Sequence, residues 1–221
     1  MSEFLETIKI EKMWEAVQET LYMTAISVVA TFILGLILGL VLFLTSKGNR
    51  WENRVVNEIT SFFVNVFRSI PFIILIILLI PFTKLLVGKM LGPTAALPAL
   101  IIGAAPFYAR MVEMSLREID KGVIEAATSM GASDWQLIKK VLIPESLPGL
   151  ISGITVTAIS LVGFTAMAGT IGAGGIGYFA FLEGFQRNNT LVTFVATIII
   201  LIIVFIIQMI GDFLAKKVDK R

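Results

Sequence analysis

Long, almost uncharged runs of apolar residues alternate with short polar segments along most of the chain. A helix needs about 20 mainly apolar residues to cross the hydrocarbon core of a bilayer. Five runs meet or approach this length, and we expect each to form one transmembrane helix. They cover residues 21–44, 59–82, 94–110, 147–169 and 191–211. The pattern predicts an all-α, polytopic membrane protein with a single transmembrane domain over residues 1–221.

The distribution of Lys and Arg between the loops predicts how these helices are oriented. Cytoplasmic loops of membrane proteins carry an excess of basic residues. The first loop, the segment between the third and fourth runs, and the C-terminal tail together hold 12 of the 18 basic residues. We therefore expect these three regions to be cytoplasmic and the N-terminus to lie outside. Five spans also require the two termini to lie on opposite sides.

Composition supports a membrane protein and excludes several chemistries. Hydrophobic residues make up 57% of the 221 residues and charged residues 15%, against about 25% charged in soluble domains. Without His or Cys the chain has no zinc finger, thiolate nucleophile or imidazole base. A net charge of +2 gives no indication of nucleic-acid binding. The sequence also lacks a P-loop. We expect a non-enzymatic protein of the cell membrane that holds no cofactor or metal and takes its energy from elsewhere.

The N-terminal residues 1–19 precede the first run and carry five glutamates. Their apolar residues roughly follow a helical period, which is typical of an interfacial helix on the outer surface. A frayed acidic tail explains the same composition, and the sequence leaves both interpretations open.

The segment between the third and fourth runs, residues 117–145, is too long for a tight turn and too charged to enter the bilayer. Its pattern predicts one helix over about residues 111–130 and another that begins near Ser133. Gly131 interrupts the pattern between them, and Ser133 or Asp134 can cap the second helix. We expect a cytoplasmic insert built from these two helices.

This insert carries a spaced motif. Glu125-Ala126-Ala127 is followed after three residues by Gly131, and after nine more by Val141-Leu142-Ile143-Pro144. The spacing resembles the EAA signature of ABC importer permeases, EAA-x3-G-x9-I-x-L-P, with Val in place of its first aliphatic residue and Ile in place of Leu. In that family the segment forms short coupling helices that dock in a groove of a separate ATPase subunit.

The resemblance implies that the insert is the surface that meets the ATPase. Ala126, Ala127 and Gly131 are small enough for a partner to approach the backbone closely, and Glu125 offers a charge-assisted contact. An ordinary solvated helix with an Ala-rich face is the alternative; the full spacing and the position before the penultimate span favour coupling. The candidate coupling residues are Glu125, Ala126, Ala127, Gly131, Ser133 and Pro144.

The resemblance extends to the methionine importer permeases over about residues 19–221. The segments that carry it are FVNVFRSIPF, IGAAPFYARMVE, GTIGAGGIG and IGDFLAKKVDKR. It implies a homodimer in the lipid bilayer, two ABC ATPase subunits on the cytoplasmic side that bind ATP and Mg, and an extracytoplasmic methionine-binding protein. The implied substrate is L-methionine, often with D-methionine and derivatives, moved by alternating access. A permease of the same architecture for another polar amino acid is the alternative.

Arg68 is the one ionisable residue well inside an apolar run, and charge at bilayer depth is costly. It either lines the translocation path or anchors a gate, or it lies near the cytoplasmic end of a long tilted helix and pairs with a phosphate or a carbonyl. Its neighbour Pro71 is expected to kink this helix. We include Arg68, Ser69 and Pro71 among the candidate path or gate residues.

A glycine-rich segment follows the fourth run. Residues 172–177 match the dinucleotide fingerprint GxGxxG, but that motif must follow a soluble strand and open a helix, so we reject this interpretation. A close-packed re-entrant bend at the outer end of the fourth span fits better. Its residues either help to close the path or only allow close packing. The candidates are Met167, Gly169, Gly172, Gly174 and Gly175.

Two other classes of protein fit the sequence less well. A self-sufficient channel or proton-coupled carrier predicts several acids within the spans, and the five cores contain none. A membrane enzyme needs clustered catalytic residues, and the nearest cluster, Glu113, Glu118 and Asp120, is expected to form solvated ion pairs with neighbouring basic residues. Two GxxxG pairs, Gly35/Gly39 and Gly149/Gly153, are expected to pack helices within one subunit.

Overall fold

Helices account for nearly all of the structure, a computed structural model that describes residues 10–219; no strand occurs within this range. Four helical stretches are long and apolar enough to cross a membrane. They are α2 (Ile10–Thr45), α6 (Pro93–Arg117), the continuous stretch Asp134–Thr170, and α11 (Thr190–Val218). A bent pair, α3 (Arg54–Ser69) and α4 (Phe72–Leu78), makes a fifth if it counts as one span. The prediction of an all-α membrane protein is confirmed.

Helix α2 is longer than its predicted span because residues 10–19 continue it without a break. A separate interfacial helix and a frayed tail are therefore both wrong for residues 10–19, while residues 1–9 lie outside the described part. The extension is held by packing: Ala16 is buried in a cluster with Ile176 and Phe179. The first turn of α10 (Gly175–Phe179) is anchored to the same part of α2, since Ile176 N donates to Thr20 Oγ1 at 2.9 Å.

The second predicted span, residues 59–82, is not one straight helix. The axes of α3 and α4 differ by 106°, and a further helix, α5 (Ile80–Val87), follows. Ile70 lies in an extended conformation between α3 and α4, because a residue before proline is disfavoured in the helical region. Pro71 also has no N–H to continue the hydrogen bonding of α3. The expected kink is present, but it breaks the span.

The predicted helix over residues 111–130 is two helices. Helix α6 runs on from the third apolar run to Arg117, and α7 (Lys121–Ser129) begins after a short break. Asp120 causes this new start, because its carboxylate accepts a hydrogen bond from Gly122 N at 2.6 Å and caps α7. The second predicted helix does begin after Ser133, as α8 (Asp134–Leu137).

The fourth span is the end of a helix that starts in the insert. Helix α8 passes through the π-helical segment η1 (Ile138–Leu142) into α9 (Ile143–Thr170) as one 37-residue stretch. Pro144 stands at the start of α9 directly after η1 and does not interrupt the stretch, in keeping with the looser hydrogen bonding of π segments. After α9 the chain turns back through α10 and η2 (Ala180–Phe185) to α11.

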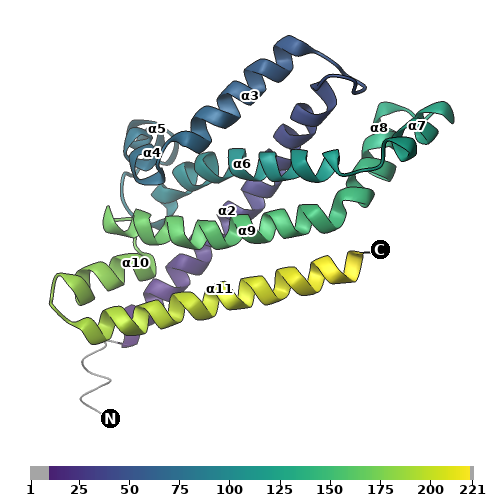
Figure 1. Cartoon of the computed structure of the whole chain (residues 1–221). Helices are drawn as coiled ribbons and strands as arrows, with labels where there is room; N and C mark the ends of the chain where they lie inside the picture. Colours follow the sequence, from purple (N-terminus) through teal and green to yellow (C-terminus); the bar gives the residue numbers. More distant parts are fainter. Residues whose placement is uncertain (1–9, 220–221) are drawn as a thin grey trace.

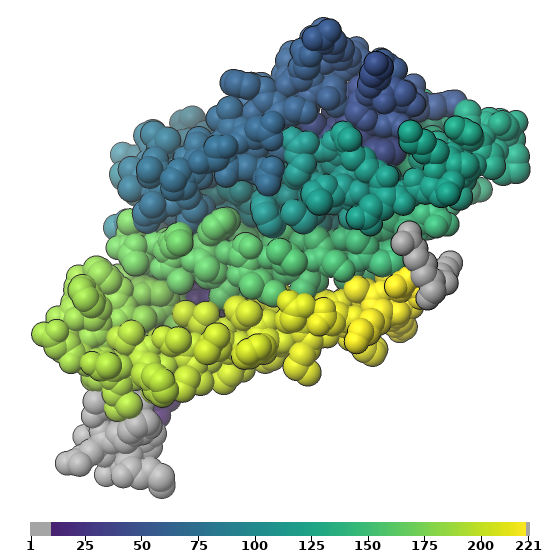
Figure 2. All heavy atoms as spheres, in the orientation of Figure 1, coloured from purple at the N-terminus to yellow at the C-terminus, as the bar shows by residue number. Residues whose placement is uncertain are grey.

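Helices α2, α6 and α9 pack against one another at the centre of the molecule. Helix α11 lies along the edge beside α9 (Figures 1 and 2). The GxxxG pairs act within the chain, as predicted. A Cβ atom on Gly39 would lie 2.5 Å from Cβ of Val112 on α6, and one on Gly153 would lie 2.9 Å from Cβ of Met111. Helix α11 leaves most of its apolar side chains exposed, which is typical of a helix that faces lipid.

The basic residues gather at one end of the molecule. The loop of residues 46–53, α7, α8 and the end of α11 lie together there, and we call this region the α7–α8 end (Figure 1). The start of α2, α5, and the connection from α10 to α11 lie at the other, which we call the α10 end. The regions rich in Lys and Arg thus lie at the opposite end of the molecule from the other connections, as the charge pattern requires. Lys220 and Arg221 lie outside the described residues.

Candidate functional site

The insert forms a helix–turn–helix at the α7–α8 end (Figure 1). Helix α7 and helix α8 are joined by residues 130–133, and α8 continues into α9. The candidate coupling residues divide into two groups. One group is exposed to solvent: Glu125, Ala126, Gly131, Ser133 and Pro144.

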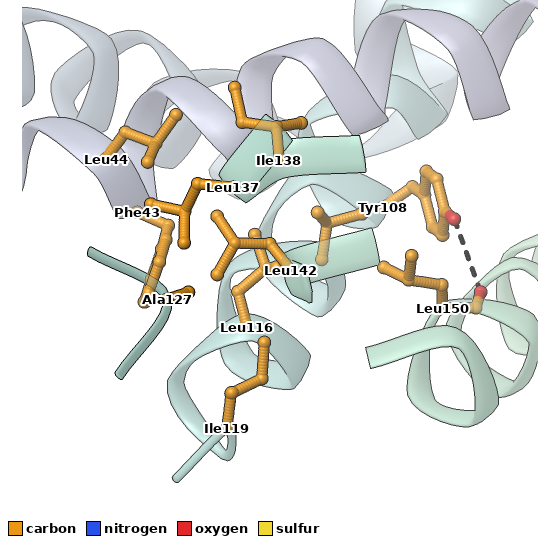
Figure 3. Close-up of a cluster of buried hydrophobic side chains, with 11 residues drawn as sticks. Phe43, Leu44, Tyr108, Leu116, Ile119, Ala127, Leu137, Ile138, Leu142 and Leu150 are labelled. Carbon is orange, nitrogen blue, oxygen red and sulfur yellow. Dashed lines mark hydrogen bonds between the residues drawn. The ribbon is translucent and has the colours of Figure 1, made fainter. Parts of the chain in front are cut away.

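Ala127 is the exception, because only 7% of its surface is exposed. It packs in a cluster with Phe43 of α2, Leu116 of α6 and Leu137 of α8 (Figure 3). Ala127 lies two residues from Glu125, on the opposite face of a helix with 3.6 residues per turn. The expectation that a partner approaches the backbone at Ala127 is therefore corrected: its buried side chain lets α7 approach the core.

Gly131 supplies the turn between α7 and α8. Its φ is +81°, in the left-handed region that favours glycine. The turn is closed by a hydrogen bond from Ala132 N to the carbonyl of Ala127 at 3.1 Å. A Cβ atom at Gly131 would meet no other atom within 4 Å. The position thus needs glycine for its conformation, and it leaves an open surface outside.

Ser133 caps α8 through a reciprocal pair of hydrogen bonds with Gln136. Gln136 N donates to Ser133 Oγ at 3.3 Å, and Ser133 N donates to Gln136 Oε1 at 2.9 Å. This capping box defines where α8 begins. Two apolar side chains flank the turn and point outward, Met130 with 82% and Trp135 with 68% of its surface exposed. Sequence reasoning missed both, although large apolar residues in a charged loop are a detectable signal.

Asp134 ties the insert to the loop between α2 and α3, in a contact that we call the Asp134 clamp. Arg50 Nε donates to Asp134 Oδ1 at 2.6 Å and Trp51 Nε1 donates to Oδ2 at 2.7 Å. The hydrogen bond from Trp51, followed by that from Arg50, lowers the pKa of the Asp134 carboxyl below its ordinary value. No local sequence signal marks this contact, because the partners are 83 and 84 residues apart.

Glu113 also differs from expectation. Its carboxylate is buried rather than solvated, between Arg110 and Arg117 of the same helix, with Arg117 Nη2 at 2.7 Å. Arg110 Nη2 also donates to Asn65 Oδ1 at 2.9 Å and so ties α6 to α3. The arrangement is a structural ion-pair network at the end of α6. Within residues 10–219 no cluster of acids that could hold a metal ion is found.

A second candidate site lies at the break between α3 and α4. A cavity of about 460 Å³ there is lined by residues of α3, α4, α6 and α9. Arg68 and Met167, two of the candidate path residues, meet in this cavity although they are 99 positions apart. Arg68 lies at the far end of α3 from the 46–53 loop, about 21 Å along the helix from Arg54. Its placement therefore disfavours the alternative that it lies near the loop end of its helix.

The other path candidates do not line this cavity. The Ser69 hydroxyl donates to the carbonyl of Asn65 in its own helix at 2.8 Å, and Pro71 forms the bend. Gly172, Gly174 and Gly175 line a different cavity, of about 470 Å³, at the α10 end. All three have positive φ values and form the turn between α9 and α10. Gly169 is buried, and a Cβ atom there would overlap with the backbone of Tyr178.

Comparison with known protein families identifies the chain. Residues 31–221 match the family described as binding-protein-dependent transport system inner membrane component. The chain belongs to this family. The family accounts for the long apolar helices, and it agrees with the expectation of a transport permease.

Named relatives resemble this permease over almost its whole length. The methionine import system permease protein MetP of Bacillus subtilis is 63% identical over 99% of this chain and 98% of its own. The probable D-methionine transport system permease protein MetI of Pasteurella multocida is 48% identical, covering 95% and 99% of the two chains. A solved inward-facing MetNI methionine ABC transporter is 43% identical, with a TM-score of 0.93 over 100% of both chains.

We expect the Asp134 clamp of this permease to restrain the 46–53 loop. In an Asp134→Asn variant the loss of the carboxylate weakens both hydrogen bonds, so trypsin should cleave the loop after Arg50 faster than in wild type at neutral pH. Because its folded-state pKa is lowered, the clamp is complete above the ordinary aspartate pKa of about 3.9 and is lost only as pH falls through the lower folded value. The wild-type cleavage pattern should thus be the same at pH 5 and pH 8, both above about 3.9.

Glu58→Gln is the matched control for this experiment. It removes the exposed ion pair with Arg54 and leaves the clamp intact, so cleavage should match wild type. Equal cleavage of Asp134→Asn and wild type would show that the clamp does not restrain the loop.

Proposed function

We propose that this permease is the membrane subunit of an ATP-driven importer of L-methionine, D-methionine and related derivatives. The observation that carries this proposal is the 63% identity to a methionine import permease over nearly the full length of both chains. The backbone similarity to a methionine ABC transporter, with a TM-score of 0.93, supports the same function. The relatives named above are methionine and D-methionine permeases, which favours methionine over another polar amino acid.

The proposed assembly gives each end of the molecule its own partners. Two copies of the permease form a homodimer in the cell membrane, with the α7–α8 end and the C-terminus cytoplasmic and the N-terminus outside. Two ATPase subunits, which bind ATP and Mg, dock at the α7–α8 end. A methionine-binding protein delivers substrate at the α10 end. The clustering of basic residues at the α7–α8 end supports this orientation.

The docking surface comprises the exposed residues around the α7–α8 turn. Met130 and Trp135 supply large apolar side chains, which commonly anchor protein interfaces. Small residues between them let a partner approach the backbone, and a carboxylate lies at the rim. The set is Glu125, Ala126, Met130, Gly131, Ser133 and Trp135, with Pro144 at the start of α9.

Continuous connections explain how the ATPase moves the path. Helix α8 passes into α9 without a break. Displacement of the docked α7–α8 turn is therefore transmitted along α9 to Met167, which lines the cavity at the α3–α4 break. The Asp134 clamp moves the α2–α3 loop together with α8. Shifting a two-state equilibrium from 1:99 to 99:1 takes about 5.5 kcal/mol of differential affinity, which ATP and the loaded binding protein supply. Arg68 and Met167 line the path, and the glycine turn borders its outer end.

Uptake of radiolabelled L-methionine tests this function. Cells that lack this permease and any redundant methionine system should take up little label, and expression of the wild-type chain with its partner subunits should restore uptake. Excess unlabelled L-methionine should compete fully and D-methionine partly, whereas other polar amino acids should not compete. Failure to restore uptake would overturn the methionine assignment, and full competition by another amino acid would reassign the substrate.

A further inference from the structure

We propose that the cavity at the α3–α4 break binds the carboxylate of the transported amino acid, and that Arg68 is its anion-binding residue. This inference rests on the proposed methionine import, because it places a binding site for that substrate inside the permease. The cavity of about 460 Å³ falls within the range of about 300–1,000 Å³ that small-molecule pockets occupy. It is therefore large enough for a single amino acid.

The charge of the cavity points to an anionic group on the ligand. Arg68 is the only charged residue that lines it. The guanidinium lies 6.0 Å from the centre of the Phe107 ring, and it forms no ion pair with any acid of residues 10–219. The Arg68 side chain is exposed at the open side of the cavity, so its charge is accessible to an anionic ligand. A substrate carboxylate is such a ligand, with the planar geometry that a guanidinium prefers.

The remaining lining suits an apolar side chain. Phe72 at the start of α4 and Phe164 of α9 stack with ring centroids 4.4 Å apart and planes only 6° from parallel. These rings and Met167 line the same cavity, and a thioether packs favourably against aromatic rings. The cavity therefore combines one cation with aromatic and aliphatic surface, which complements an apolar amino acid with a free carboxylate.

Gly163 of α9 keeps part of the cavity open. A Cβ atom there would meet no other atom within 4 Å, although Gly163 lies on a helix between packed neighbours. At Gly103, which faces the cavity from α6, a Cβ atom would lie 3.2 Å from Cδ2 of Phe72. Because Gly163 lines the cavity, a larger side chain there would reduce the space available to a ligand. This gives a second way to test the site that does not involve charge.

Direct binding to the permease assembled with its ATPase subunits, without the binding protein, tests the proposal. Radiolabelled L-methionine is the probe, measured by scintillation proximity on the purified complex. We expect saturable binding to wild type and a loss of about tenfold or more in affinity for Arg68→Gln, the magnitude typical of a charge-assisted contact. Gly163→Leu should lose binding because its side chain fills the cavity. Arg68→Lys should retain part of the affinity.

Arg54→Gln is the matched control, because Arg54 lies on the same helix and pairs with Glu58 outside the cavity. It should bind as wild type does. Displacement by methioninol, in which a hydroxymethyl group replaces the carboxylate, tests the group that is recognised. Unlabelled L-methionine should displace the label from wild type and methioninol should not.

Three results would overturn the site: no saturable binding to wild type, unchanged affinity in Arg68→Gln, or equal displacement by methioninol. None of these results overturns the proposed function, methionine import, if wild-type cells still take up methionine. Absence of uptake in those cells would instead overturn the proposed function. Size-exclusion profiles of every variant show whether a loss of binding reflects misfolding.

Discussion

A Gly131→Asp permease is expected to insert normally into the membrane and to lose methionine uptake by about tenfold or more, the effect of disrupting the centre of a protein interface. Gly131 lies at the exposed turn of the insert, and a Cβ atom placed there would have no other atom within 4 Å. The new carboxylate would therefore obstruct the approach of a partner, in addition to the backbone strain that a side chain brings at a φ of +81°. Uptake of radiolabelled L-methionine and co-purification of the ATPase with a tagged permease measure the effect.

Gly88→Asp separates docking from backbone strain. Gly88 ends α5 near the α10 end, has a φ of +75°, and is also without neighbours within 4 Å of a Cβ atom. Both variants place Asp in the left-handed region, where it is tolerated better than most side chains. Gly88→Asp should keep wild-type uptake and ATPase association. Equal uptake by Gly131→Asp and wild type would remove Gly131 from the docking surface, and an equal loss in both variants would assign the effect to strain.

Gly169→Leu and Gly177→Leu are expected to abolish folding of the permease. These glycines bring α9 and α10 into direct backbone contact: a Cβ atom on Gly169 would overlap with Tyr178 N, and one on Gly177 with the carbonyl of Ala166. Backbone atoms within packed helices cannot shift as the end of a flexible side chain can, so the overlap exceeds the usual overpacking cost of about 1–3 kcal/mol. Immunoblots of membrane fractions and size-exclusion profiles in detergent should show little or no folded protein.

Gly163→Leu is the control for this pair of variants, because the same substitution meets open space on the same helix α9. It should accumulate and elute as wild type does. If Gly169→Leu folds normally but blocks uptake, Gly169 acts in the translocation path and not in packing. If Gly163→Leu also fails to fold, the change from Gly to Leu in α9 is harmful irrespective of contacts.

Features that depend on neighbouring residues were predictable from the sequence. The apolar runs indicate the membrane helices, Ser133 marks the start of α8, and the spacing from Glu125 to Pro144 indicates the family. Each is local because hydrogen bonding and capping within a helix involve residues a few positions apart. Prediction was less successful where two local preferences compete. The apolar pattern of residues 111–130 favours one continuous helix, whereas Asp120 favours the start of a new helix and caps α7. Likewise, Pro71 indicates a kink but not its angle of 106°.

The placement of side chains that are distant in sequence required the tertiary structure. Arg68 and Met167 share a cavity because α3 ends beside α9, and Asp134 binds Arg50 and Trp51 because α8 starts beside the α2–α3 loop. Ala127 is buried because α7 turns that face toward the core. Such contacts depend on how each helix is rotated and where it crosses its neighbours, which close-packed positions such as Gly39 against Val112 determine. Hydrophobic periodicity establishes that a helix exists, whereas only the packing of several helices together selects which side chains meet.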